Sequence, residues 1–336
     1  MQVSLWQRTK MLCPFCMKHH SGSTFVCPEK GTKIPALYIE DTKRGVPVVV
    51  MLTIGYSGHG KTCFLSSFFH SLYHGTISEH WPDFSFIGLT METLNRIHHE
   101  YVNILDQGHL PPKTPIMFPT PLILKFQKIP LKVKNWYKRC VKGLGMEQGE
   151  VIMIFYDIGG GTFDVDEKIR QNVPVLQEIN TLIFLVSLPQ IINEAQTGSI
   201  SVVQRMHRLL NTLVIALTDL GQKKKKDILI CFTMGDEMWD QENILYGPLS
   251  MRFSHFIPYS GEFQEYFTNL WIDSQIITEH VQSEYTPFYN ALLNNFRRIR
   301  FTSISSLGTP PTKEGQIMNL SPANVFDPLL NLLQLE

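Results

Sequence analysis

The most distinctive chemical pattern in the sequence is G-x-x-x-x-G-K-[ST], which spans residues 55–62. Glycines let a loop bring several backbone N–H groups around one anion, because no Cβ atom obstructs the approach. The lysine of such a loop reaches the β- and γ-phosphates of a nucleotide, and the hydroxyl beside it can ligate Mg²⁺. We therefore expect a nucleotide-binding loop. Its predicted contact residues are Gly55, Tyr56, Ser57, Gly58, His59, Gly60, Lys61, Thr62 and Cys63.

The segments on either side have the pattern that such a loop requires. An apolar run at 48–54 precedes it and predicts a buried strand, and a run with an apolar face at 64–73 predicts a helix. The strand delivers the loop, and the helix presents its unpaired N-terminal amides to phosphate. The alternative, a glycine-rich turn with a solvated lysine, is less consistent with this arrangement.

Further residues are expected to complete the phosphate end of the site. Asp157 ends an apolar run at 150–156, as when a buried parallel strand delivers an acid to its C-terminal edge. We expect Thr62, Thr114 and Asp157 to hold Mg²⁺, the last through water, and the amide of Gly160 in the D-x-x-G pattern to contact the γ-phosphate. Thr114 lies in a proline-rich loop where nucleotide switches place a threonine that senses this phosphate. A connector whose threonine has no role is the alternative. Together with Lys61, these are the predicted catalytic residues.

Two later segments predict a base-binding side. An apolar strand at 228–232 ends in T-M-G-D, where GTPases carry [NT]-K-x-D, and Asp236 is placed to accept hydrogen bonds from guanine. Thr233 belongs to the same motif, and Met234 replaces its lysine, which raises ATP as an alternative to GTP. A turn of small residues after the last predicted strand could contact guanine O6 through a backbone amide. Its candidate residues are Ser305, Ser306 and Leu307.

Cysteines near the start of the chain have the spacing of metal ligands. Cys13 and Cys16 form a C-x-x-C knuckle, and Cys27 follows. Thiolates this close in sequence can face one tetrahedral Zn²⁺, and a segment of about 30 residues could hardly fold without such a link. The fourth ligand would be His19 or His20, and we assign His20. The alternatives are a ribbon that has lost its metal, or reduced cysteines packed as small apolar residues.

Composition limits the classes of partner. The 336 residues contain 30 basic and 30 acidic side chains, so no overall field favours nucleic acid or an anionic membrane. The lysine run at 223–226 predicts a solvated turn, or a docking patch for an acidic protein. The first residues lack the order of a secretory signal, and no apolar stretch approaches the roughly 18 residues of a membrane helix. We expect a cytoplasmic protein whose partners are GTP or GDP and other proteins.

The alternation of predicted strands and helices indicates an α/β P-loop NTPase fold, with a mostly parallel six-stranded sheet flanked by helices. We divide the chain into a zinc-ribbon-like segment, 1–44, and a nucleotide-binding domain, 45–336. An aromatic-rich insertion around 240–283 would serve as a lid or partner surface. The predicted strands are 48–54, 122–126, 150–156, 181–187, 228–232 and 300–304, and the predicted helices are 64–73, 89–105, 202–220, 289–296 and 322–335.

The combination resembles the bacterial double-GTPase family, P-loop GTPases encoded in predicted conflict or defence systems. The resembling segments are the zinc-ribbon start, 55–62, Thr114, 157–160, 233–236, 305–308 and the final 325–330. The resemblance implies Mg²⁺-dependent GTP hydrolysis by a switch within a multi-protein system. Gly161 stands where such enzymes often carry a Glu or Gln that positions water. A nucleotide-binding scaffold with little hydrolysis is therefore the main alternative.

Overall fold

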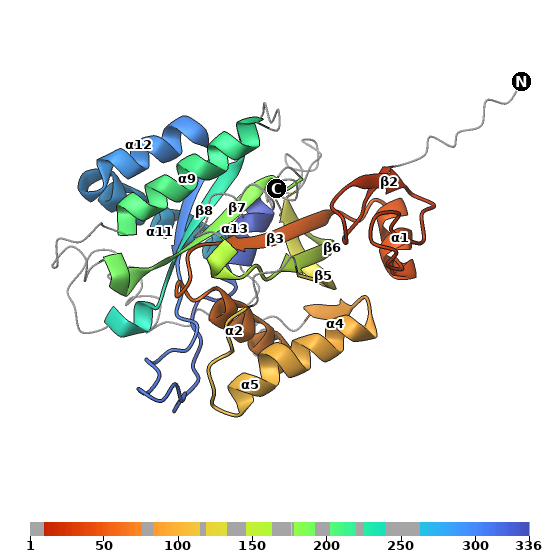
Figure 1. Ribbon diagram of the computed structural model, residues 1–336, viewed down its shortest axis with the longest axis horizontal. Helices are drawn as coiled ribbons and strands as arrows, with labels where there is room; N and C mark the ends of the chain where they lie inside the picture. The colour runs from red at the N-terminus through yellow and green to blue at the C-terminus, as the bar shows by residue number, and fades with distance from the viewer. Residues whose placement is uncertain are drawn as a thin grey trace, which may run out of the picture.

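The structure is a computed structural model that describes residues 10–75, 83–114, 119–132, 146–162, 176, 178–191, 202–219, 225–238 and 263–335. Helices cover both faces of one seven-stranded sheet, and a small cysteine-bearing module lies at one end of the molecule (Figure 1). Among the described residues, no helix is long and apolar enough to cross a lipid bilayer. The mixed α/β architecture with a mostly parallel sheet is the one predicted.

Seven strands form the sheet, and all but one of them were expected from the sequence. In chain order they are β3 (Val48–Ile54), β4 (Ser85–Gly88), β5 (Leu122–Lys132), β6 (Met146–Tyr156), β7 (Thr181–Ser187), β8 (Asp227–Thr233) and β9 (Ile299–Ser303). Their spatial order is β4-β5-β6-β3-β7-β8-β9. Strand β5 runs antiparallel to both of its neighbours, β4 and β6, and the remaining pairs are parallel. Strand β3, which leads into the predicted nucleotide-binding loop at 55–62 (called the phosphate loop below), is therefore central.

Helices cover the sheet on both sides. They are α2 (Lys61–Tyr73), α4 (Met91–Arg96), the π-helix η1 (Ile97–Val102), α5 (Asn103–Asp106), α9 (Val202–Asp219), α11 (Phe263–Glu284), α12 (Thr286–Asn295) and α13 (Asp327–Leu335). Alternate residues of β3 enter different cores: Val49 packs with α2, η1 and α13, whereas Val50 packs with α9 and α12 (Figure 1). Because both faces are covered, the central strands are continuous apolar runs in the sequence.

The N-terminal module consists of a two-stranded hairpin, β1 (Lys10–Leu12) and β2 (His19–Ser21), and helix α1 (Ala36–Lys43). It packs on the same core as the sheet. Tyr156 at the end of β6 donates a hydrogen bond to the carbonyl of Pro14. Asp41 of α1 and Lys125 of β5 are both buried and form an ion pair at 3.1 Å. Each of these buried charges is tolerated because the other compensates it. Since one belongs to α1 and the other to β5, the pair joins the module to the sheet.

The structure differs from the predicted elements in three places. The extra strand, β4, has only four residues, too few to show an alternating pattern. The single helix expected at 89–105 is divided into α4, the π-helical turn η1 and α5. Residues 263–284, expected to lack periodic structure, form α11, while 239–262 lie outside the described residues.

Two residues of the lysine run can also be placed, and Lys225 is exposed, as a solvated turn would require. Lys226 is buried, and its Nζ donates to the carbonyl of Ile179 at 2.5 Å, so this lysine is not part of a solvated turn. Lys223 and Lys224 lie outside the described residues. The run therefore includes at least one lysine whose role is to connect two backbone segments.

Candidate nucleotide-binding site

The phosphate loop connects β3 to α2. Gly55, Gly58 and Gly60 have φ angles of 153°, 84° and 74°, a region that side chains disfavour. Gly60 precedes the first turn of α2, which no described side chain caps. Uncapped amides at a helix N-terminus are the groups that bind an anion. Lys61 donates to the carbonyls of Gly55 and Tyr56, each at 2.7 Å, so its ammonium is held over the loop.

Buried contacts hold the loop against β7 and β8. His59 is only 1% exposed, and its Nδ1 donates to the carbonyl of Leu185 at 2.9 Å. Burial lowers the pKa of His59 to about 4, although the hydrogen bond to Leu185 opposes the shift, so the ring is neutral near pH 7. Thr233 Oγ1 lies 3.0 Å from the carbonyl oxygen of His59 and 3.2 Å from that of Val186, and its single proton is shared between these two acceptors. The predicted motif threonine thus supports the loop itself.

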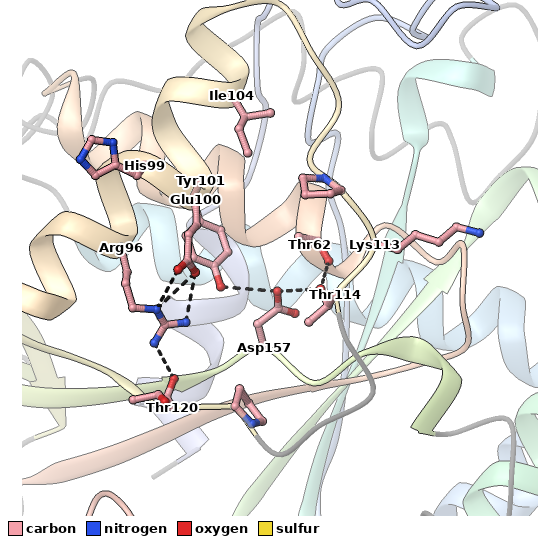
Figure 2. A pocket seen from close by; sticks show the side chains of 12 residues that line it. Thr62, Arg96, His99, Glu100, Tyr101, Ile104, Lys113, Thr114, Thr120 and Asp157 are labelled. Carbon is pink, nitrogen blue, oxygen red and sulfur yellow. Dashed lines mark hydrogen bonds and ion pairs between the residues drawn. The ribbon is translucent and has the colours of Figure 1, made fainter. Parts of the chain in front are cut away.

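Thr62, Thr114 and Asp157 come together from three parts of the chain. The hydroxyl oxygens of Thr62 and Thr114 lie 2.6 Å apart, and Thr114 donates to Asp157 Oδ2 at 2.9 Å (Figure 2). Because a hydroxyl has one proton to donate, Thr62 is the donor to Thr114 in this arrangement. Hydroxyl and carboxylate oxygens are the hard ligands that Mg²⁺ prefers.

The carboxyl of Asp157 has the environment of a cation ligand. The side chain is 7% exposed, and burial raises its pKa, although the hydrogen bond from Thr114 acts in the opposite direction. Its second oxygen, Oδ1, is buried and makes no hydrogen bond to any described residue. An unpaired buried oxygen costs about 1–3 kcal/mol or more, and a bound cation would remove that cost. Thr62, Thr114 and Asp157 therefore fit Mg²⁺ in both donor chemistry and electrostatics.

Gly160 lies directly against the phosphate loop. A methyl group on its Cα would come within 2.6 Å of the nitrogen and Cα of Ser57, and within 2.8 Å of Lys61 Nζ. No side chain fits there unless the backbone moves, so the D-x-x-G segment and the loop are closely packed. Gly161 follows, and it has no side chain that could position a water molecule.

A cavity of about 540 Å³ opens beside Thr62, Thr114 and Asp157. Arg96 lines it and donates to Glu100 at 3.1 Å and to the carbonyl of Thr120 at 2.9 Å (Figure 2). From η1, the Tyr101 hydroxyl faces Asp157 Oδ2 at 3.5 Å. Short π-helical turns are frequent at functional sites. The cavity therefore gives a ligand or a partner group access to the candidate magnesium residues.

The predicted base-binding residues also come together. Ser305 Oγ donates to a carboxylate oxygen of Asp236 at 2.5 Å and accepts from the amide of Gly308 at 2.9 Å. The Ser67 hydroxyl of α2 donates to the carbonyl of Ser306 at 2.5 Å, which fixes this turn against the phosphate-loop helix. Burial raises the pKa of Asp236, and the hydrogen bond from Ser305 opposes that shift. The neighbouring Leu307 is buried.

Met234, which replaces the lysine of the [NT]-K-x-D motif, lies beside the phosphate loop. A methyl group on Gly60 would lie 3.6 Å from Met234 Cε, and the Ser187 hydroxyl faces Met234 Sδ at 3.5 Å. Its φ of 61° places the residue in the left-handed region. The thioether provides apolar packing but lacks the ammonium of lysine. Cys63 remains a neutral thiol near pH 7, because burial, followed by the charges of Asp157 and Asp236, raises its pKa to about 11.

The four predicted zinc ligands form one cluster. The donor atoms of Cys13, Cys16, His20 and Cys27 lie within 4.8 Å of one another, and Cys16 Sγ is 3.1 Å from His20 Nε2. His19 instead contacts Glu178 at 3.2 Å. Three thiols and one imidazole are a donor set that suits tetrahedral Zn²⁺. The structure thus favours His20 over His19 as the fourth group, and the residues fit the ion.

Several residues of the site were not predicted. The spacing of Tyr101 within 89–105 indicated only an apolar helix face, but its hydroxyl reaches Asp157. Arg96 and Glu100 have the i,i+4 spacing of a surface ion pair, and only the fold places them at the cavity. Sequence spacing contained no signal for the contact of Ser67 with Ser306, because 239 residues separate them.

No family model matches the chain, and no curated protein matches it. Among solved structures, the chain is similar to the signal recognition particle receptor SRb-GTP/SRX complex from Chaetomium thermophilum. The sequence identity is 12% and the TM-score is 0.34, and the comparison covers 79% of this chain and 93% of that chain. It is also similar to the S. cerevisiae Ski7 GTPase-like domain bound to GTP (12% identity, TM-score 0.37) and bound to GDP and inorganic phosphate (13%, 0.37). Each Ski7 comparison covers 88% of this chain and 52% of that chain, so this chain spans about half the length of the Ski7 chains.

Proposed function

We propose that this chain binds GTP with Mg²⁺, hydrolyses it to GDP and phosphate, and acts as a molecular switch. One observation carries the proposal: Thr62, Thr114 and Asp157 form a continuous hydrogen-bonded group at the N-terminal end of the helix that begins with Lys61. A glycine-rich turn with a solvated lysine would not need this group, whereas a site for a nucleotide with Mg²⁺ uses hydroxyl and carboxylate ligands of this kind.

Each residue has a role in the proposal. The loop amides and Lys61 hold the phosphates, while Thr62, Thr114 and Asp157 hold Mg²⁺, which supplies positive charge for the transferring phosphoryl group. The Gly160 amide donates to the γ-phosphate, so its segment moves when that phosphate leaves. Catalysis of this kind depends on positioning and electrostatics rather than on a covalent enzyme intermediate.

Guanine selectivity would depend on Asp236, which accepts hydrogen bonds from the base while Ser305 holds its carboxyl in place. Met234 would pack against the base without the contacts of a lysine. This substitution favours weaker selectivity for GTP over ATP than the full motif provides. An ATPase is the corresponding alternative.

A second candidate function is a nucleotide-binding scaffold with little hydrolysis. Gly161 favours it, because the residue after D-x-x-G has no side chain to position water. A protein partner could supply the missing group, as activating proteins supply an arginine. The cavity next to Asp157 is where such a group would enter.

We further propose that the chain is one component of a bacterial multi-protein system, for which antiphage defence is one candidate role. This part of the proposal depends on the family resemblance alone. The cysteine cluster would hold structural Zn²⁺. The zinc-ribbon-like segment and the region around 240–283 would contact protein partners. Trp271 on α11 is half exposed, which is consistent with such a surface.

The test is a titration of the purified chain with GTP and ATP in Mg²⁺, followed by measurement of phosphate release. We expect GTP to bind more tightly than ATP. Phosphate release should be lost in Asp157→Asn and retained in Glu237→Gln, which changes the acid next to Asp236 and leaves Thr62, Thr114 and Asp157 intact. GTP binding without release, in the absence of a partner, would favour the scaffold. Equal affinity for ATP and GTP would contradict the assignment of Asp236.

A further inference from the structure

A second group of potential metal ligands lies at the far end of the phosphate-loop helix. His70 lies in the last turn of α2, His74 directly follows that helix, and Asp106 is the last residue of α5. Asp106 Oδ1 lies 3.1 Å from His70 Nε2 and 2.9 Å from His74 Nε2. All the donor atoms of the three residues lie within 4.8 Å of one another.

This geometry is close to that of a metal site. Around a tetrahedral ion with bonds of about 2.0–2.1 Å, neighbouring ligand atoms are about 3.3 Å apart. Both Nε2 atoms converge on one carboxylate oxygen, and the two rings have centroids 4.3 Å apart. Small side-chain movements would therefore bring all three donors onto one ion, with no change in the helices.

Access and charge also suit a cation. His74 and Asp106 are 44% and 38% exposed, so an ion can enter from solvent and keep water or another group as further ligands. His70 is more buried, at 18%. The two histidines lie in and just after the last turn of α2, and the C-terminal end of a helix attracts positive charge.

We propose that His70, His74 and Asp106 form a metal site, separate from the cysteine cluster, for Zn²⁺ or another late first-row divalent ion. Two imidazoles and one carboxylate suit zinc, with at least one position open. Bound metal would join the end of α2 to the end of α5. The segment that follows α5 leads to Thr114, so the ion would also restrain the side of the cavity next to Asp157.

Without a metal, the same atoms form a hydrogen-bonded group in which both Nε2–H groups donate to Asp106. These two possibilities give different results when Zn²⁺ is added. If the group binds no ion, replacing the histidines leaves the number of zinc ions bound per chain unchanged. If it is a metal site, the variant binds one zinc ion fewer.

The experiment is a Zn²⁺ titration of the full chain by calorimetry, with bound metal counted by atomic absorption after gel filtration. The His70→Ala/His74→Ala variant is compared with His98→Ala/His99→Ala, which removes two histidines from the adjacent η1. We expect the first variant to lose one zinc equivalent relative to wild type and the second to lose none. Unchanged stoichiometry in the first variant, or equal losses in both, would overturn the proposal.

A conservative variant guards against a folding defect. Asp106→Asn keeps the shape and the hydrogen-bond acceptor but removes the charge. We expect it to weaken the same zinc equivalent by at least about tenfold, because loss even of a residue that only orients a ligand costs that much. Wild-type affinity in Asp106→Asn, with a circular dichroism spectrum like that of wild type, would count against the site. Cys16→Ser should leave this equivalent in place, and its loss there would contradict two separate sites.

Discussion

The hydroxyl oxygens of Thr62 and Thr114 lie 2.6 Å apart, although 52 residues separate them in the chain. This contact attaches the segment after α5 to the first turn of the phosphate-loop helix, and Thr114 continues the chain of hydrogen bonds to Asp157. Coordination of a cation by these oxygens would replace the hydrogen bonds among them. The position of the Thr114 segment and the occupancy of the site are therefore linked.

The first prediction concerns this link. Thr114→Val keeps the shape of the side chain but removes the hydroxyl, so Asp157 loses its donor and Mg²⁺ loses a candidate ligand. We expect Mg²⁺-dependent GTP affinity to fall by roughly 10- to 150-fold, since hydrogen bonds to charged groups contribute about 1.5–3 kcal/mol and each 1.4 kcal/mol is a factor of about ten. Fluorescent GTP titrations at several Mg²⁺ concentrations measure it. Thr120→Val, at the same cavity, is the matched control, and an equal loss there would argue against a specific role for Thr114.

The second prediction separates guanine recognition from phosphate binding. Asp236→Asn retains an oxygen that can accept from Ser305 but cannot accept two hydrogen bonds from guanine as a carboxylate does. We expect the binding free energy of GTP to become less favourable by about 1–3 kcal/mol, which is the cost of leaving polar groups unpaired. The affinity for ATP should be unchanged. Competition of GTP and ATP for one fluorescent nucleotide measures the ratio. A parallel loss for both nucleotides would mean that Asp236 supports the fold of the site rather than the base.

The strand, glycine turn and helix at 48–73 and the positions of the central strands along the chain could be predicted, because each is encoded locally. The apolar run before Gly55 and the glycine spacing after it require a buried strand and a tight turn. Asp157 could be placed in the same way, since it ends another such run and parallel strands share one C-terminal edge. Residues at the ends of neighbouring parallel strands meet whatever the connecting loops do.

Features that depend on tertiary packing rather than on local sequence pattern could not be predicted. Tyr101, whose hydroxyl faces Asp157, lies in a π-helical turn within the helix expected at 89–105, and sequence periodicity does not report such a turn. Strand β4 was missed because four residues at a sheet edge have too weak a pattern. The assignment of His20 agrees with the cluster in the structure, but the spacing alone allowed His19 as well, because only the folded hairpin decides which side chain faces the three cysteines.

The third prediction concerns pH. His59 has an ordinary pKa of 6.5 in the unfolded chain and about 4 in the folded one, because burial disfavours the charged ring. Between these values the unfolded chain binds a proton that the folded chain does not, so stability falls as the pH decreases. We expect this residue to contribute about 2 kcal/mol to the difference in unfolding free energy between pH 7 and pH 5.

Other groups titrate in the same range, so the His59 contribution is isolated with His59→Gln, which keeps a donor for the Leu185 carbonyl. Urea unfolding at both pH values should show a smaller difference in the variant than in wild type. The same pH dependence in both proteins would mean that His59 is not buried in the neutral form.

The fourth prediction tests the cysteine cluster. Cys16→Ser removes one soft ligand, so we expect the chain to lose its chelator-resistant zinc and to unfold at lower temperature, because structural zinc contributes directly to folding. Cys63→Ser also removes a thiol, but from α2, and should retain the zinc. Metal analysis after dialysis against a chelator gives the result. Wild-type zinc content in Cys16→Ser would rule out this residue as a ligand.

The central claim is that residues 55–62 bind nucleotide phosphates, and the most direct measurement is calorimetric titration of GTP with Mg²⁺ into wild type and Lys61→Ala. Since Lys61 also donates to Gly55 and Tyr56, the unfolding temperature of each protein is measured alongside. We predict saturable binding to wild type and none to a folded Lys61→Ala variant. Equal binding by both proteins, or binding by neither, would contradict the assignment of this loop as the nucleotide site.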